Sequence, residues 1–284
     1  MPELASVNGK ITPIDQACVS IHDRGLVLGD GVYEVIVSYH DKLFLFDEHI
    51  ARLRRSLAYV RMSYVDVDEV VRLIRQVFQA AAMPRAKVYL QITRGEAPRN
   101  HAFPVPQIKP NLIITVRAFP EMDPALFDAG IVCLTQPDLR WGRVDIKTIN
   151  LLPNCLAKQA ALDAGCHDAI FIAADGLVRE ATAANVFVIR HGVFLTHPAN
   201  EHILSGVTRN CLIDLIRGAG WTVEERAATE QEMMTADEVF LSGTTAEVLP
   251  VIRINGRPIA DGQPGPISRK LLGIFRAWIR QNGY

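Results

Sequence analysis

The segment RWGRVDIKTINLLPN, residues 140–154, places a lysine, Lys147, in a stretch rich in apolar residues. The chain has seven lysines among its 30 basic residues, so a lysine here is unusual. An arginine keeps its proton in a protein, whereas a partly buried lysine can lose it and become a nucleophile. Arg140 and Arg143 would favour that loss if they lay close to the amine. Lys147 is therefore a candidate nucleophile, and the alternative is a strand-edge lysine with its amine in water.

A carboxylate, Glu180, follows an apolar strand pattern in LVREATAANVF and precedes five small or polar residues, 181–185. Small neighbours allow a flat ligand to approach. If the ligand held a pyridine ring, the carboxylate would keep the ring nitrogen protonated and preserve its capacity to accept electrons. The alternative is an ordinary polar turn between two strands.

Two glycine-containing turns are candidates for binding a phosphate. In LSGVTRN, residues 204–210, Gly206 comes directly before an apolar helical pattern, and the N–H groups at a helix start bind anions. The alternative is a simple N-cap by Ser205 or Thr208. The turn SGTTAE, residues 242–247, follows a strand pattern and could close over the same phosphate.

The segment TRGEAPRNHAFP, residues 93–104, places Arg99 and His101 two positions apart in a loop stiffened by prolines. An arginine fork suits a substrate carboxylate, and Tyr33, on an earlier strand pattern, could add a hydroxyl. The alternatives are a solvated surface loop and a half-buried strand tyrosine.

Together these groups supply an amine, a carboxylate for a ring nitrogen, a phosphate site and a carboxylate clamp. That combination indicates pyridoxal phosphate bound as a Schiff base, with an amino acid as substrate. The competing hypothesis is a non-catalytic protein that binds a phosphorylated ligand through the turns at Gly206 and Gly243 and needs no reactive lysine.

The chain also resembles the fold-type IV pyridoxal-phosphate enzymes, and among them the D-amino-acid transaminases. The segments that carry the resemblance are DRGLVLGDGVYEV, HIARL, TRGEAPRNHAFP, RWGRVDIKTINLL, EATAANVF, THPANEHILSGVTR and SGTTAEVLPV. The resemblance implies that Lys147 forms the Schiff base and shuttles the proton, and that Glu180 faces the pyridine nitrogen. It implies further cofactor-binding residues, which contact the phosphate: Arg52, Val207, Thr208, Thr244 and Thr245.

The resemblance assigns the substrate carboxylate to Tyr33, Arg99 and His101. It also implies a homodimer in which the Arg99 and His101 loop reaches the partner's active site. The implied reaction is a ping-pong transamination of D-amino acids such as D-alanine, D-glutamate or D-aspartate with 2-oxoglutarate or pyruvate. Alternatives within the fold type are branched-chain L-amino-acid aminotransferases, R-selective amine transaminases and aminodeoxychorismate lyase, which resemble the PRNH segment less. The chain departs from the D-amino-acid enzymes in the segment ATAA after Glu180. Serines are familiar there in those enzymes, whereas in this chain only Thr182 keeps a hydroxyl.

The elements that must position these residues form a mixed α and β pattern. In the first half, a strand over 32–40 turns at Asp41-Lys42 into LFLF. A helix then begins near Asp47 as N-cap. The other expected elements of this half are a helix over 68–83 and strands over 88–94 and 112–119.

The second half alternates strands and helices. The expected helices cover 154–164, a stretch after Gly206, and 266–282, and a hairpin turns at Asn255-Gly256. We expect an α+β, two-domain fold-type IV architecture. The expected parts are a smaller N-terminal α/β domain (1–119), a linker (120–129) and a larger C-terminal coenzyme-binding domain with a barrel-like sheet (130–284).

The 284 residues carry a formal net charge of -1, which gives no support to nucleic-acid binding. No apolar run approaches the roughly 20 residues that span a bilayer, and no signal-peptide pattern begins the chain. The five cysteines are scattered and form no CxxC pair, which argues against disulfides and a metal site. We therefore expect a cytoplasmic protein that binds small-molecule substrates.

Overall fold

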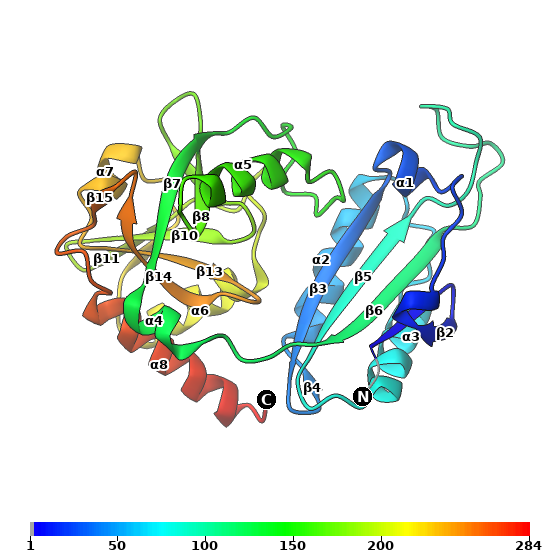
Figure 1. Cartoon of the computed structure of the whole chain (residues 1–284), viewed down its shortest axis with the longest axis horizontal. Coiled ribbons are helices and arrows are strands. Elements are labelled where there is room, and N and C mark those ends of the chain that lie inside the picture. The colour runs from blue at the N-terminus through cyan, green and yellow to red at the C-terminus, as the bar shows by residue number, and fades with distance from the viewer. Residues whose placement is uncertain (1–2) are drawn as a thin grey trace. The chain divides into compact units, whose positions relative to one another are not determined.

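The computed structural model describes residues 3–284, and its contacts divide the chain into two compact units (Figure 1). The first unit consists of the residues up to Glu121, Ile146–Asn150 and Tyr284. The second consists of Met122–Asp145 and Leu151–Gly283. The segment with Lys147 therefore groups with the first unit, although it follows a strand and a helix of the second.

The first unit contains a six-stranded antiparallel sheet in the order β2-β1-β6-β5-β3-β4. Its strands are β1 (Leu4–Val7), β2 (Lys10–Pro13), β3 (Gly31–Tyr39), β4 (Lys42–Leu43), β5 (Ala86–Thr93) and β6 (Asn111–Ala118). Its helices are α1 (Arg24–Leu28), α2 (Phe46–Tyr59) and α3 (Val67–Ala81), with a short 3-10 turn at Ile14–Gln16.

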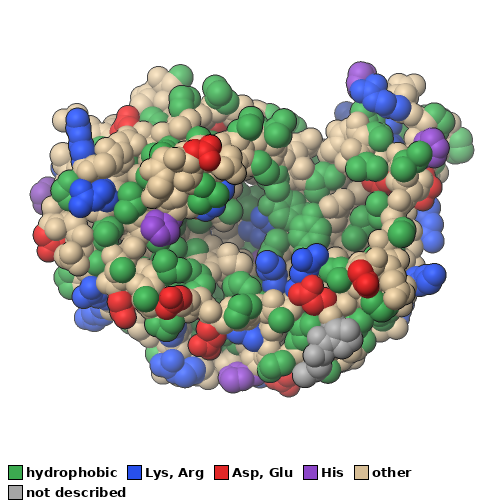
Figure 2. All heavy atoms as spheres, viewed as in Figure 1, with side chains coloured by type: hydrophobic (Ala, Val, Ile, Leu, Met, Phe, Trp, Pro, Cys, Tyr) green, Lys and Arg blue, Asp and Glu red, His purple; other side chains and the backbone are tan. Residues whose placement is uncertain are grey.

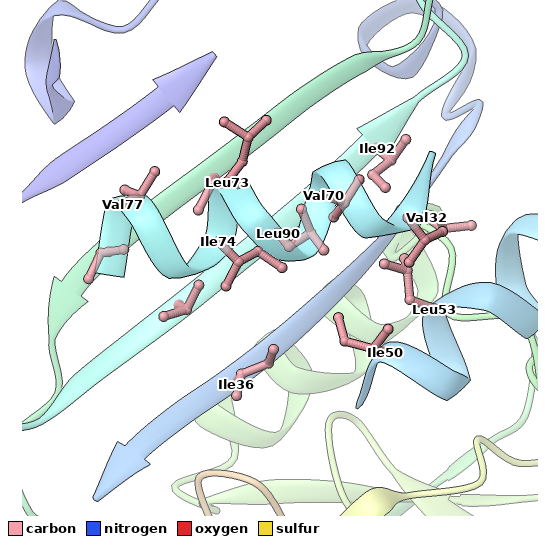
Figure 3. Packing of buried hydrophobic residues seen from close by; sticks show 14 of the residues in the cluster. Val32, Ile36, Ile50, Leu53, Val70, Leu73, Ile74, Val77, Leu90 and Ile92 are labelled. Carbon is pink, nitrogen blue, oxygen red and sulfur yellow. The ribbon is translucent and has the colours of Figure 1, made fainter. Parts of the chain in front are cut away.

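One face of this sheet forms a hydrophobic core with α2 and α3. Alternate residues of β5, such as Val88 and Leu90, are fully buried, as the period of a strand requires. Figure 3 shows the facing side chains of α3, α2, β3 and β5: Val70, Leu73, Ile74, Val77, Ile50, Leu53, Val32, Ile36, Leu90 and Ile92. Asp66 caps α3 by accepting hydrogen bonds from Asp68 N and Glu69 N at 3.1 Å.

Two local predictions for this unit are wrong. The hairpin turn consists of His40 and Asp41, because Lys42 already pairs with Tyr39, and LFLF supplies only a short strand. Leu45 has a φ of 45°, which ends the extended chain and places it at the N-cap of α2. Asp47 therefore lies inside the first turn of α2, where its charge still favours the helix dipole.

The second unit contains a nine-stranded sheet. The strands are β7 (Ile131–Pro137), β8 (Asp168–Ile172), β9 (Val178–Ala181), β10 (Asn185–Arg190), β11 (Val193–Thr196), β12 (Val223–Glu224), β13 (Glu238–Gly243), β14 (Glu247–Ile254) and β15 (Arg257–Pro258). Pairing of β9 with β10 closes β10-β13-β14-β7-β8-β9 into a six-stranded barrel. The predicted mixed fold with a barrel-like sheet is confirmed.

The helices of the second unit are α4 (Pro124–Ala129), α5 (Leu152–Asp163), α6 (Val207–Gly218), α7 (Glu230–Met234) and α8 (Pro266–Gln281). Helix α4 lies within the expected linker, and the predicted hairpin at Asn255-Gly256 joins β14 to β15. Among the helices of residues 3–284, none is long and apolar enough to cross a membrane. On the face shown in Figure 2, basic and acidic side chains are interspersed, in keeping with the net charge of -1.

Candidate cofactor and substrate site

The lysine segment lies beside the first residues of β3, and backbone hydrogen bonds join the two. Tyr33 N donates to Lys147 O at 2.9 Å, and Ile149 N donates to Gly31 O at 3.3 Å. Thr148 forms an antiparallel bridge with Val32, and Lys147 N donates to Ser56 Oγ of α2 at 3.3 Å. The backbone on both sides of the lysine is therefore fixed by a strand and a helix of its own unit.

The Lys147 amine lies over an aromatic ring. Its Nζ is 4.2 Å from the centroid of the Tyr33 ring, and the side chain is half-buried. Tyr33 in turn stacks on Tyr89, with 5.7 Å between the ring centroids. The contact with the Tyr33 ring and the half-buried side chain restrict the position of the amine. They also place two of the predicted site residues, Lys147 and Tyr33, in direct contact.

Arg52 belongs to a buried charge cluster on the helix-facing side of β3. It donates to both carboxylate oxygens of Glu34, from Nε at 2.8 Å and from Nη2 at 2.7 Å. His49 Nδ1 lies 2.8 Å from Glu34 Oε2. Burial alone would raise the pKa of the Glu34 carboxyl, but Arg52 and His49 lower it to about 2. Arg52 is thus held by a carboxylate that stays ionised.

His49 is neutral at physiological pH. Its burial lowers its pKa, and although Glu34 opposes this, the charges of Arg52 and Lys147 lower it further. Glu34 accepts only hydrogen bonds, so the pairing places the His49 proton on Nδ1. The electrostatic effect of Lys147 on His49 links the charge cluster to the lysine.

Glu180 is buried in the second unit, at the end of β9. Its Oε1 accepts a hydrogen bond from Arg140 Nη1, and its Oε2 accepts from Asn185 Nδ2 at 3.1 Å and Leu204 N at 3.0 Å. Arg140 is oriented by Asp138, to which Nε and Nη2 donate at 2.9 and 2.8 Å. Charge-assisted bonds of this kind stabilise the carboxylate form of Glu180.

The N-terminus of α6 has the features of an anion site. Gly206 is the N-cap residue of α6, and no side chain caps the helix. The alternative of a simple N-cap by Ser205 or Thr208 is therefore wrong. The first N–H groups of a helix have no partner within it. In the described part of the chain, the buried hydroxyl Oγ1 of Thr208 also has no hydrogen-bond partner. A phosphate would satisfy both, so these residues fit the phosphate of pyridoxal phosphate.

Asn185 connects the Glu180 carboxylate to both glycine turns. Its Nδ2 donates to Leu204 O at 2.9 Å, and a Cβ added to Gly206 would lie 2.1 Å from its Oδ1. Asn185 also pairs with Ser242 across β10 and β13, so the turn that follows β13 starts beside it. Thr244 is half-buried and Thr245 is exposed in that turn. The second unit therefore gathers Glu180, the α6 N-terminus and the later turn.

Arg99 and His101 lie in the first unit, on the loop between β5 and β6, and both are exposed. The loop is closed at its base, where Gly95 has a φ of 111° and an added Cβ would lie 2.0 Å from Lys109 O. Only a glycine at position 95 allows the two backbone segments to lie this close together. Thr182, the hydroxyl residue left after Glu180, donates from Oγ1 to Asp168 Oδ1 at 2.5 Å.

The sequence interpretation missed the residues that hold the predicted ones: Glu34, His49, Asp138 and Asn185. Two signals were available for the first pair. Glu34 occupies an inward position of β3 between the apolar residues Val32 and Ile36, and His49 lies three positions before Arg52, on the same face of a helix. A charged residue in an otherwise apolar register requires a partner.

Comparison with known proteins places the chain in a family. Residues 31–254 match the family model described as amino-transferase class IV. The chain belongs to the aminotransferase class IV family. It is 37% identical over 277 residues to a D-alanine aminotransferase of Staphylococcus epidermidis, covering 97% of this chain and 98% of that protein. It is 40% identical over 270 residues to a D-alanine aminotransferase of Bacillus licheniformis, covering 93% of each.

Solved structures of branched-chain amino acid aminotransferases share the fold. The Escherichia coli structure has a TM-score of 0.89 at 25% identity and covers 98% of this chain and 94% of that chain. A second such enzyme, solved with pyridoxamine 5'-phosphate, has a TM-score of 0.88 at 26% identity and covers 96% and 92% of the two chains.

Proposed function

We propose that this protein is a pyridoxal-phosphate-dependent D-amino-acid transaminase. It transfers the amino group of a D-amino acid such as D-alanine, D-glutamate or D-aspartate to 2-oxoglutarate or pyruvate in two half-reactions. The observation that carries the proposal is the Lys147 amine, held over Tyr33 by a backbone fixed to β3 and α2. The preference for D-amino acids is supported by the D-alanine aminotransferase relatives at 37% and 40% identity.

In this proposal Lys147 binds the coenzyme covalently and Glu180 contacts its ring nitrogen. The phosphate is bound by Arg52, Val207, Thr208, Thr244 and Thr245. Pyridoxal phosphate, when bound, supplies an aldehyde that condenses with amines and a pyridinium ring that withdraws electrons from the substrate Cα. Support comes from the Thr208 hydroxyl, which has no hydrogen-bond partner among residues 3–284, and from the donors that bond to the Glu180 carboxylate.

The lysine then acts as an acid and a base. With the coenzyme bound, the Lys147 amine would accept the proton from the substrate Cα as a base and, once protonated, would donate it as an acid. The backbone hydrogen bonds of the lysine segment to β3 and α2 fix the position from which the amine acts. Which face of the substrate presents its hydrogen to Lys147 decides the stereochemistry, and the carboxylate clamp selects that face.

The clamp consists of Tyr33, Arg99 and His101. Arg99 supplies a guanidinium fork for the carboxylate, and His101 supplies a second donor. Because both side chains are exposed on their loop, we propose a homodimer in which this loop reaches the partner subunit's active site. We also propose that the enzyme acts in the cytoplasm on small-molecule substrates.

The test compares single half-reactions with D-alanine, L-leucine, aminodeoxychorismate and an R-configured amine that lacks a carboxylate. We expect D-alanine alone to bleach the visible band of the coenzyme-loaded protein and release pyruvate. Bleaching by L-leucine instead would move the enzyme to the branched-chain aminotransferases. Pyruvate from aminodeoxychorismate, or turnover of the amine, would indicate the lyase or the amine transaminases. A protein with no visible band after loading would contradict the proposal.

A further inference from the structure

Two buried arginines of the first unit share one carboxylate next to the Arg99 and His101 loop. Arg24 of α1 is 2% exposed, and Arg94, which follows β5, is 4% exposed. Arg24 Nε donates to Asp30 Oδ2 at 2.8 Å. Arg94 donates from Nε to the same oxygen at 2.8 Å and from Nη2 to Oδ1 at 3.0 Å. Asp30 therefore fixes the direction of both guanidinium groups.

The Arg24 guanidinium holds the loop on both sides of His101. Its Nη1 donates to Asn100 O at 2.6 Å and to Ala102 O at 3.3 Å. Ala102 N in turn donates to Asn100 Oδ1 at 3.1 Å, which closes a tight turn around His101. The backbone that carries His101 is thus anchored to a buried cation, while its side chain remains exposed.

Arg94 holds the next part of the same loop. Its Cζ lies 3.6 Å from the centroid of the Phe103 ring, a cation–π contact on a partly exposed ring. Its Nη2 also donates to Val60 O at 2.7 Å, so the guanidinium cannot follow the ring if the loop moves. The two arginines together restrain residues 100–103, directly beside Arg99.

We propose that Arg24, Asp30 and Arg94, here called the Asp30 brace, are positioning residues for recognition of the substrate carboxylate. The brace holds the loop in one conformation before substrate binds, so little conformational entropy is lost when Arg99 and His101 engage the carboxylate. This inference rests on the proposed function, which assigns the carboxylate to that loop.

The first test is Arg24→Lys, assayed with D-alanine in the coenzyme-loaded enzyme. A lysine keeps the charge, but a single ammonium cannot bond Asp30 and both carbonyl oxygens as the guanidinium does. We expect KM for D-alanine to rise about tenfold with kcat near that of the wild type, because a misplaced clamp weakens binding. Hydrogen exchange of the peptide over 97–104 should also become faster.

The matched control is Arg72→Lys, because Arg72 also donates from Nε and Nη2 to one carboxylate, Glu69, but on the exposed face of α3. We expect it to change neither KM nor loop exchange. Phe103→Ala is a second test that leaves the buried charges intact and removes the ring that Arg94 contacts. Phe103→Ala should also raise KM for D-alanine. If Arg24→Lys does not fold, Phe103→Ala alone tests the Asp30 brace.

Arg99→Ala tests the carboxylate clamp separately from the Asp30 brace. If Arg99→Ala raises KM for D-alanine while Arg24→Lys and Phe103→Ala do not, the clamp stands and the Asp30 brace is overturned. If Arg99→Ala leaves KM unchanged, the clamp assignment itself fails and the brace fails with it. Faster loop exchange together with raised KM in both brace variants is the result that supports the inference.

Discussion

Glu34→Gln should destabilise the first unit strongly at neutral pH. The Glu34 carboxylate is fully buried and accepts two hydrogen bonds from Arg52 and one from His49. A glutamine has the same shape, but its amide N–H groups would face the N–H groups of Arg52 or His49. The change therefore leaves a buried guanidinium without its counter-ion, which is one of the costlier defects in a protein core.

The magnitude follows from the pKa of Glu34. Its value falls from an ordinary 4.5 to about 2 in the folded protein, which corresponds to about 3 kcal/mol of stability at neutral pH. Because the folded pKa is the lower one, this stability is present above pH 4.5 and is lost as the pH falls toward 2. We expect the difference between wild type and Glu34→Gln to be about 3 kcal/mol at pH 7 and about 1 kcal/mol at pH 3.

The chain offers a way to observe the first unit alone. Its tyrosines all lie in the first unit, at positions 33, 39, 59, 64, 89 and 284, and its tryptophans all lie in the second, at 141, 221 and 278. Urea unfolding followed by tyrosine absorbance therefore reports the first unit, and tryptophan fluorescence reports the second. Glu34→Gln should lower the urea midpoint of the tyrosine signal.

The matched control is Glu69→Gln, which removes an exposed carboxylate paired with Arg72 in the same unit. It should leave the tyrosine midpoint nearly unchanged, because exposed ion pairs contribute little. A Glu34→Gln protein as stable as the control at pH 7, or a deficit that does not shrink between pH 7 and pH 3, would show that the ionised Glu34 carboxylate does not stabilise the first unit.

Two further substitutions test the second unit. Thr208→Val removes a buried hydroxyl that has no partner within the described residues, so it should not destabilise the coenzyme-free protein but should weaken pyridoxal phosphate binding about tenfold by spectroscopic titration. Thr196→Val is the control, because Thr196 Oγ1 donates a hydrogen bond to Val186 O at 2.9 Å. This substitution should lower stability without changing coenzyme affinity. Equal coenzyme affinities in the two variants would contradict the assignment of Thr208 to the phosphate. Arg140→Met leaves Asp138 and Glu180 without their common cation, so both coenzyme affinity and kcat should fall by about tenfold or more in titration and steady-state assays. Unchanged values would show that Glu180 does not depend on Arg140.

Local sequence patterns predicted much of the fold. Apolar periodicity located α3 and α8 within about two residues, and the glycine before an apolar helical pattern located the start of α6. The hairpin at Asn255-Gly256 followed from turn chemistry alone. The α2 boundary was mispredicted because Leu45 adopts a left-handed backbone that its residue type does not favour.

The contacts that organise the candidate site were harder to predict, because they join residues far apart in sequence. Arg24 contacts Asn100 across 76 positions, and Arg140 contacts Glu180 across 40. Such pairs depend on how strands and loops are brought together, and no local pattern encodes them. The predicted residues Lys147 and Tyr33 did prove to be in contact, because β3 pairs with the lysine segment.

We propose Lys147 as the amine that binds pyridoxal phosphate. The most direct measurement is borohydride reduction of the coenzyme-loaded protein, followed by proteolysis and mass spectrometry of the phosphopyridoxyl label. We expect stoichiometric label on the peptide that contains Lys147, and none in Lys147→Ala. Label on any of the other six lysines, or a labelled Lys147→Ala protein that still converts D-alanine to pyruvate, would contradict it.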